Sequence, residues 1–213
     1  MKLATILGLA MVAVFLPSFA LADSNVNFLN HDGTITANMG NQLTLTGSTL
    51  AGISGLGMYD CPPPACSGTV TFTTGHTLNS GTLTTSATFG AGGSITVTST
   101  AAGAGFVFTG SFSSATWTKN GTGATAFWTF VGTIANGTLT LSNGTTFTGI
   151  NGATINLTTL GGPVVVGGFN TWEDSGGSTT FPSPIPEPGT LTLLGTGLVS
   201  IATFARHRMA KKS

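Results

Sequence analysis

The central part of the chain alternates apolar and polar residues with a period of two. The alternation is clear at residues 43–46, 70–73 and 95–98, and it continues through longer segments at 105–117 and 125–135. A period of two places successive side chains on opposite faces of a strand, so these segments are predicted to be half-buried β-strands. No stretch between the two apolar ends of the chain has the spacing of an amphipathic helix.

Aromatic residues recur at alternate positions of the two longest segments. Phe106, Phe108 and Phe112 share one parity, and Trp128 and Phe130 share one face of the next segment. Because residues of one parity lie on one face of a strand, these rings are predicted to face the core.

Asn-Gly pairs interrupt the second half of the pattern at residues 120–121, 136–137, 143–144 and 151–152. Both positions of a type I′ turn take positive φ, which Asn and Gly tolerate, so Asn-Gly between alternating runs favours a β-hairpin. This part of the chain is therefore predicted to be an antiparallel meander.

The predicted fold class is all-β, an antiparallel β-sandwich or barrel. A β-solenoid is the alternative, but a solenoid needs a fixed repeat period, which the chain lacks. The Thr/Gly-rich β-domain is predicted to span residues 23–166. Glycine pairs followed by a run of prolines predict a flexible, Pro-rich linker over residues 167–185.

The first residues have the order of a secretory signal peptide. A positive start at Met1-Lys2 precedes an uncharged apolar run over residues 3–15, and Ala20 and Ala22 form a small-x-small site. We predict a signal helix within residues 1–22 and cleavage after Ala22, which makes signal peptidase an expected partner.

Three features follow one another at the C-terminal end. The tripeptide Pro186, Glu187 and Pro188 precedes an uncharged apolar segment, residues 189–205, and a basic tail follows. About 17 residues is the lower limit for a transmembrane helix, so residues 189–205 are predicted to span a membrane. The basic residues, which favour a cytoplasmic position, are Arg206, Arg208, Lys211 and Lys212.

This arrangement, over about residues 184–213, resembles the PEP-CTERM sorting signal, so we predict that residues 186–213 form such a signal. The resemblance implies a Gram-negative bacterium and processing by an exosortase, a membrane cysteine peptidase. It also implies transient anchoring in the inner membrane, followed by delivery to the cell surface or the extracellular matrix. Exopolysaccharide is then an expected partner. The resemblance implies no particular activity for the β-domain.

Charge is sparse in the predicted mature domain. Residues 23–184 contain one basic and five acidic side chains, a net charge of −4. The net charge of zero for the whole chain therefore depends on the cations of its two ends. A domain with a single cation has no basic surface for nucleic acid, so nucleic acid is not expected as a partner.

The chain has two cysteines, Cys61 and Cys66. Disulfides persist in exported proteins, so we predict that these residues close a small disulfide loop. A redox motif would need Cys-x-x-Cys, and two cysteines without a nearby histidine make a poor zinc site. We therefore favour the structural disulfide over these two alternatives.

Catalytic motifs are absent from the sequence. His76, Asp60 and a serine could form a triad on paper, but serine is so abundant that the coincidence carries no weight. No nucleophile elbow, paired carboxylates or phosphate-binding loop is present. We predict a protein without enzymatic activity, cofactor or metal.

The leading hypothesis from the sequence is an exported, surface-sorted structural or extracellular-matrix protein, associated with a biofilm. The alternative is a carbohydrate-binding or adhesin module. In that alternative, Trp117 and Trp172 are predicted to be exposed and to offer flat platforms to sugar rings.

Overall fold

The structure is a computed structural model. It describes residues 25–183 apart from 39, 64–65, 79–82 and 102–103, together with residues 196, 197 and 200. Asn25–Ser183 form one compact unit, and the following description concerns this unit.

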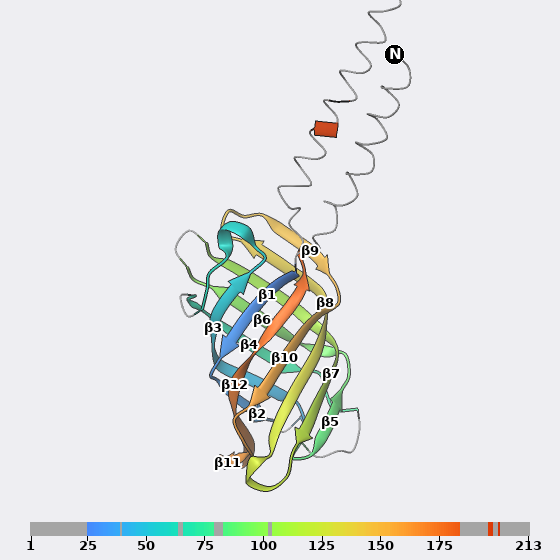
Figure 1. Ribbon diagram of the computed structural model, residues 1–213. Coiled ribbons are helices and arrows are strands. Elements are labelled where there is room, and N and C mark those ends of the chain that lie inside the picture. Colours follow the sequence, from blue (N-terminus) through green and yellow to red (C-terminus); the bar gives the residue numbers. More distant parts are fainter. Residues whose placement is uncertain are drawn as a thin grey trace, which may run out of the picture. The chain divides into compact units, whose positions relative to one another are not determined.

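The described residues of this unit form strands, most of them joined by short connections, and two 3₁₀ helices, η2 (Gly57–Tyr59) and η3 (Gly123–Thr125). The strands, shown in Figure 1, are β1 (Asn25–His31), β2 (Thr34–Ala37), β3 (Leu43–Ser54), β4 (Gly68–Thr74), β5 (Ser86–Phe89), β6 (Gly92–Ser99), β7 (Phe106–Asn120), β8 (Phe127–Leu141), β9 (Thr146–Ile150), β10 (Ala153–Thr159), β11 (Val164–Val166) and β12 (Phe169–Pro182).

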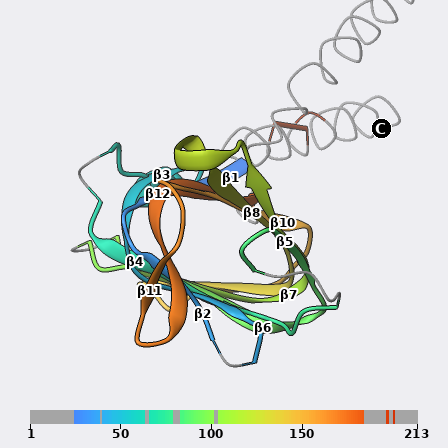
Figure 2. The ribbon, with the colours of Figure 1, turned by 90° about the horizontal axis from the view of Figure 1, so that it is seen from below.

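Eight strands close into an antiparallel barrel in the order β1, β3, β4, β6, β7, β8, β10 and β12. The pairing of β12 with β1 completes the ring, which is seen end-on in Figure 2. Each ring strand neighbours the next ring strand along the chain, which is the up-and-down arrangement. The predicted all-β antiparallel fold is confirmed as a barrel, and the solenoid alternative is not supported.

The short strands lengthen this ring at its ends. β2 lies between β3 and β12, while β5, β9 and β11 pair with β7, β8 and β12 respectively. Closure removes most free strand edges, which otherwise invite pairing with other chains.

Aromatic rings fill the interior of the barrel. Phe108 stacks on Phe181 with ring centroids 4.8 Å apart, and Phe72 stacks on Phe130 at 4.6 Å. An eight-stranded barrel is just wide enough for side chains to fill it. Burying each ring stabilises the fold by roughly 1.5–3 kcal/mol, so the interior is the main source of stability.

One glycine in the barrel wall makes room for this packing. A Cβ added to Gly132 would lie 2.5 Å from the ring of Phe112 and 3.0 Å from the side chain of Ile155. Only glycine therefore lets the Phe112 ring lie against the wall at this position.

Three of the four Asn-Gly pairs lie at turns, next to the end of β7 and on either side of β9. The fourth, Asn136-Gly137, lies inside β8 instead. Asn136 has a φ of +53°, and the pairing of β8 with β9 shifts register after Gly137. At this position the positive φ belongs to a β-bulge within a long strand and not to a turn.

The predicted flexible linker over residues 167–185 is wrong for most of its length. Residues 169–182 form β12, so the domain extends well beyond the predicted boundary at residue 166. Gly176 is required by packing, because a Cβ there would lie 2.7 Å from the carbonyl oxygen of Asn30. The glycines that suggested flexibility instead allow close approach of neighbouring strands.

Both ends of the unit lie side by side, because Asn25 pairs with Pro182. The predicted signal helix in residues 1–22 lies outside the described residues. So does the predicted transmembrane segment 189–205, except for residues 196, 197 and 200, which are helical. Among the residues that the structure describes, no helix is long and apolar enough to cross a membrane.

Candidate functional site

Trp117 and Trp172 are buried, with 0% and 1% of their surface exposed. Trp172 lies between two other tryptophans, with ring centroids 5.1 Å from Trp117 and 6.0 Å from Trp128. The three rings belong to the packed interior. The prediction that Trp117 and Trp172 form a ligand platform is therefore wrong.

A β-bulge explains the misplacement of Trp117. Phe108 and Phe112 face inward as predicted, but the pairing of β7 with β8 shifts register between Phe112 and Ser114. One extra residue moves every later side chain to the opposite face. Trp117 therefore points inward, where its Nε1 donates a hydrogen bond to the carbonyl oxygen of Leu83 at 2.8 Å.

Two rows of residues, nine of them threonine and one valine, cross the outer face of the barrel. They run over β4, β6, β7, β8 and β9, and each residue lies directly opposite the next across the strands. We call them the threonine rows. The first consists of Thr69, Thr98, Val107, Thr140 and Thr146, and the second of Thr71, Thr96, Thr109, Thr138 and Thr148.

Strand geometry gives the threonine rows a regular spacing. Neighbours within a row lie about 4.8 Å apart, and the two rows lie about 6.7 Å apart along each strand. The Oγ1 atoms of Thr140 and Thr146 are 3.3 Å apart, at hydrogen-bond distance. Every position is exposed or half-buried. The rows therefore present hydroxyl and methyl groups without any charge.

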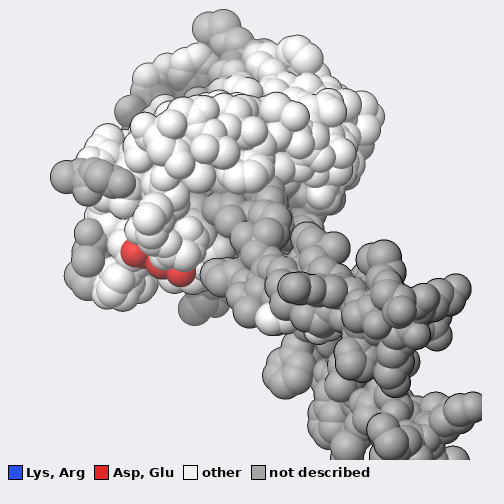
Figure 3. All heavy atoms as spheres, turned by 90° about the horizontal axis from the view of Figure 1, so that it is seen from above, with Lys and Arg blue, Asp and Glu red and all other residues white. Residues whose placement is uncertain are grey.

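The rest of the described surface carries few charges. On the face shown in Figure 3, the described residues have one small patch of acidic atoms and no basic atoms. Over all the described residues there is one lysine, Lys119, whose Nζ lies 5.4 Å from the ring centroid of Trp128. Such a cation–π contact contributes about 0.5–1 kcal/mol at an exposed position. Electrostatic steering of a charged partner is therefore weak on this surface.

A polar cluster interrupts the apolar interior. Its members are Asn30, Ser48 and Asp174, which are 5%, 0% and 1% exposed. The Asn30 amide donates to Ser48 Oγ at 2.8 Å and to Asp174 Oδ2 at 3.1 Å, and the Gly176 N–H donates to Asp174 Oδ1 at 3.1 Å. Buried polar groups need hydrogen-bond partners, and these atoms of the cluster have them.

Strand irregularities meet at this polar cluster. The pairing of β1 with β3 shifts register at Asn30, that of β3 with β4 at Ser48, and that of β10 with β12 at Asp174. The Asp174 N–H also donates to the carbonyl oxygen of Gly33 at 3.0 Å. Bulges leave backbone groups unpaired. The polar cluster supplies hydrogen bonds at the place where these three strand pairings shift register.

Burial raises the pKa of Asp174 from 3.8 to about 6. Hydrogen bonds from Gly176, Ser48 and Asn30 lower the pKa, and the negative charge of Asp32 raises it further. The carboxyl group is enclosed by strands, so its position favours a structural role over contact with a ligand.

The acid and base noted in the sequence lie at opposite ends of β3. Asp60 precedes Cys61, which pairs with Ile53 near the end of this strand. His76 Nδ1 lies 2.9 Å from the carbonyl oxygen of Gly40, before the strand begins. β3 has 12 residues, and a strand rises about 3.3 Å per residue, so its two ends lie roughly 36 Å apart. The structure does not bring the two side chains together.

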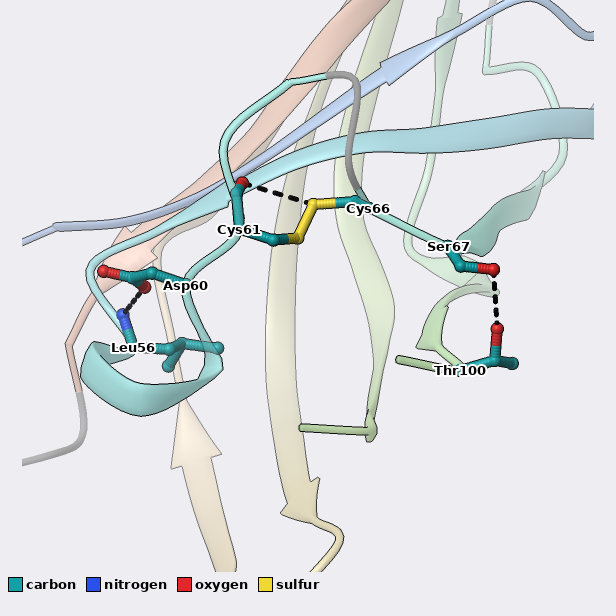
Figure 4. Close-up of a disulfide and its surroundings, with 6 residues drawn as sticks. All are labelled: Leu56, Asp60, Cys61, Cys66, Ser67 and Thr100. Carbon is teal, nitrogen blue, oxygen red and sulfur yellow. Dashed lines mark hydrogen bonds between the residues drawn. A yellow bond between two sulfur atoms is a disulfide. The ribbon is translucent and has the colours of Figure 1, made fainter. Parts of the chain in front are cut away.

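Cys61 and Cys66 form the predicted disulfide (Figure 4). The Cys61 backbone is held to β3 by two hydrogen bonds with Ile53, at 2.9 and 3.1 Å. Asp60 accepts a hydrogen bond from the Leu56 N–H at 2.6 Å. The disulfide loop is therefore attached to β3 through Cys61, and the Leu56–Asp60 hydrogen bond closes the preceding turn, which contains η2.

Residues 184–208 match the family model of the PEP-CTERM protein-sorting motif. The chain carries a PEP-CTERM motif. This finding confirms the resemblance noted from Pro186, Glu187 and Pro188. A PEP-CTERM motif implies an exosortase-processed protein that is exported to the surface of a Gram-negative cell. Neither a search of curated proteins nor a search of solved structures found a match.

Apart from residues 196, 197 and 200, the residues of the PEP-CTERM motif lie outside the described part of the chain. The same holds for the basic tail and for the predicted cleavage site at Ala20 and Ala22. The two alanines stay a prediction from the signal-peptide pattern, as do Lys211 and Lys212, which follow the matched residues.

Sequence reasoning missed the threonine rows and the polar cluster. Thr-x-Thr pairs are visible at residues 69–71, 96–98, 138–140 and 146–148. They become rows only through the strand registers, which the sequence does not reveal. Asp174 was missed because its segment was predicted to be a linker.

Proposed function

We propose that this protein is a non-enzymatic component of the cell surface or the extracellular matrix, including a biofilm matrix. An exosortase-like peptidase would process it during transit through the inner membrane. The observation that carries the proposal is the match of residues 184–208 to the PEP-CTERM motif.

The fold supports a structural role. A closed ring with an aromatic interior offers few free strand edges and little access for proteases. The disulfide between Cys61 and Cys66 adds a covalent link that persists outside the cell. Such a module keeps its shape in an exposed environment, and its outer face is the part that meets a matrix.

The absence of enzymatic activity is part of this proposal. The separation of His76 from Asp60 and the enclosure of Asp174 support it, because acid–base catalysis needs groups within hydrogen-bond reach of one another or of a substrate.

The sorting proposal is tested in a Gram-negative host that carries an exosortase. We expect wild-type protein in the surface fraction, with an intact mass that lacks the segment after Pro188. A variant with Pro186, Glu187 and Pro188 replaced by alanine is expected to stay with the inner membrane. Surface material that retains residues 189–213 would contradict processing.

The threonine rows favour a second candidate function, the binding of a neutral polysaccharide. Threonine hydroxyls can exchange hydrogen bonds with sugar hydroxyls, and threonine methyls can pack on the apolar faces of sugar rings. The barrel wall curves, so a flexible chain follows the rows better than a flat crystalline surface. Many weak contacts along one chain add through effective concentration. This candidate takes the place of the tryptophan platform.

Affinity electrophoresis in native gels tests this second candidate, with dextran and hydroxyethyl cellulose as neutral probes and alginate as the charged control. We expect retardation by a neutral probe that does not depend on salt, because the rows carry no charge. Replacing Thr96, Thr109, Thr138 and Thr148 by valine keeps the shape and should abolish retardation. The matched serine variants keep the hydroxyls and should retain part of it. Equal retardation of the wild-type and valine variants would refute the role of the rows.

A further inference from the structure

The hairpin formed by β11 and the start of β12 exposes an apolar surface. Val164, Val165 and Val166 are 66%, 69% and 59% exposed, and Leu160 nearby is 69% exposed. No charged residue occurs between residues 160 and 172. Adjacent exposed apolar side chains of this kind mark interaction sites.

The backbone of this hairpin shows what the surface can bind. Gly167 and Gly168 form a two-residue turn with φ of +60° and +87°, as a type I′ turn requires. Val166 and Phe169 are the closing pair, which is hydrogen-bonded in such a hairpin. Because hydrogen-bonded pairs alternate along an antiparallel ladder, the N–H and C=O of Val165 point away from β12.

The unpaired N–H and C=O groups of a strand edge can be satisfied by pairing with another strand. Among the described residues, β11 pairs with β12 and with no other strand. Lipid could cover the valine side chains, but it would leave the N–H and C=O of Val165 without partners, at a cost of several kcal/mol for each group. An extended segment of protein satisfies both the backbone and the side chains.

We propose that the partner is a second copy of this chain, paired antiparallel through β11 about a two-fold axis at Val165. In this pair each Val165 N–H donates to the Val165 carbonyl oxygen of the other copy, and Val164 lies opposite Val166. The edge is self-complementary because its three residues are all valine, and no charge opposes the approach. An interface in which both copies use the same patch closes as a dimer.

The neighbouring residues limit the pairing to this short edge. Pro163 has no N–H and cannot extend the ladder. β11 pairs with the first residues of β12, at the opposite end of that strand from Pro182, where the chain continues toward the sorting motif. The edge therefore lies at the end of the unit that its chain connections leave free.

The small size of the interface determines its strength. Stable complexes bury about 1,200–2,000 Å² in total, and this pairing adds only β11 and Leu160 from each copy. The dimer is weak and forms where the protein is concentrated, as it would be on a surface. The pairing does not rest on the proposed function, because it depends only on β11.

Sedimentation velocity over a range of concentrations tests the pairing. All ring strands lie within Asn25–Ser183, so residues 23–183 contain every partner that their strands need and are used alone. Wild type is expected to show a concentration-dependent dimer. Val165→Pro removes the outward N–H and should abolish the dimer without changing the thermal midpoint, because the hairpin does not use that N–H. Val165→Thr keeps the shape and the N–H and should still dimerise.

A cysteine variant gives a second readout. Val165→Cys is expected to form a covalent dimer under mild oxidation, since Cα atoms of directly opposed residues lie about 5.5 Å apart, within disulfide reach. Val131→Cys, at another exposed valine, should stay monomeric.

Three results would overturn the proposal. The first is a wild type that stays monomeric at its highest soluble concentration. The second is a Val165→Pro variant that dimerises as well as wild type. The third is equal binding of wild type and Val165→Pro to phosphatidylcholine vesicles without dimerisation, which would assign the surface to lipid.

Discussion

Replacing Asp174 by asparagine is expected to remove a pH-dependent cost of folding. The carboxyl group is buried, and its pKa is raised from 3.8 to about 6. The folded state therefore holds this proton more tightly than the unfolded state. The resulting stabilisation is present in full below the unfolded pKa of 3.8 and is lost as the pH rises through about 6.

The magnitude follows from the raised pKa. A change of one pKa unit corresponds to about 1.4 kcal/mol, so the ionised carboxylate costs roughly 3 kcal/mol at most at neutral pH. The new amide keeps one oxygen for the Gly176 N–H, but its NH₂ group faces the Asn30 amide nitrogen, which is also a donor. Asn30 Oδ1 has no partner in the described structure, so a flip of the Asn30 amide supplies an acceptor. We expect a net gain of about 1–3 kcal/mol above pH 7.

Urea unfolding of residues 23–183 between pH 4 and pH 8 measures this effect. The quantity of interest is the free energy of unfolding of Asp174→Asn minus that of wild type, because the titration of other carboxylates cancels in the difference. It should rise from about pH 4 to about pH 7 and then level off. Glu173→Gln, which removes a carboxylate at the exposed neighbouring residue, is the matched control variant.

Two outcomes would refute the reasoning. A difference that is flat across the range would mean that Asp174 pays no penalty for ionisation when buried. A difference that falls with rising pH would mean that hydrogen bonds from Asn30, Ser48 and Gly176 favour the carboxylate more than burial disfavours it.

Two further predictions concern the interior and the disulfide. Trp117→Phe should cost about 1 kcal/mol more than Trp172→Phe in thermal unfolding, because it leaves the Leu83 carbonyl without its donor. Trp172 Nε1, by contrast, has no hydrogen-bond partner among the described residues. Equal costs would contradict this assignment. Replacing Cys61 and Cys66 together by serine should cost at most about 2 kcal/mol, because the loop is short. The urea midpoint checks it, and a loss above about 4 kcal/mol would show that the disulfide acts through more than chain entropy.

Much of the fold could be predicted from local patterns. Alternation identified the strands, and three Asn-Gly pairs identified turns, because both signals depend on neighbouring residues alone. The choice between sandwich and barrel could not be made this way, because it depends on whether β12 returns to pair with β1. That contact joins residues at opposite ends of the domain.

The boundary of the domain was missed for a related reason. Gly176 and Gly177 suggested a flexible linker, since glycine is common in both linkers and crowded strands. A crowded strand differs from a linker in its neighbours. Here the carbonyl oxygen of Asn30, 146 residues away in sequence, approaches Gly176. Only the folded ring reveals this crowding.

The error about the direction of Trp117 has a physical cause that also indicates where a functional surface should be sought. An extra residue in a strand reverses every later side chain, so alternation misplaces Trp117 after the bulge in β7. The threonine rows cross β7 at Val107 and Thr109, before the first register shift in its pairing with β8. The pairing there is uninterrupted from strand to strand. A regular outer surface exists where the registers are undisturbed, so the threonine rows are a better place to test for a ligand than any residue whose exposure was predicted from alternation alone.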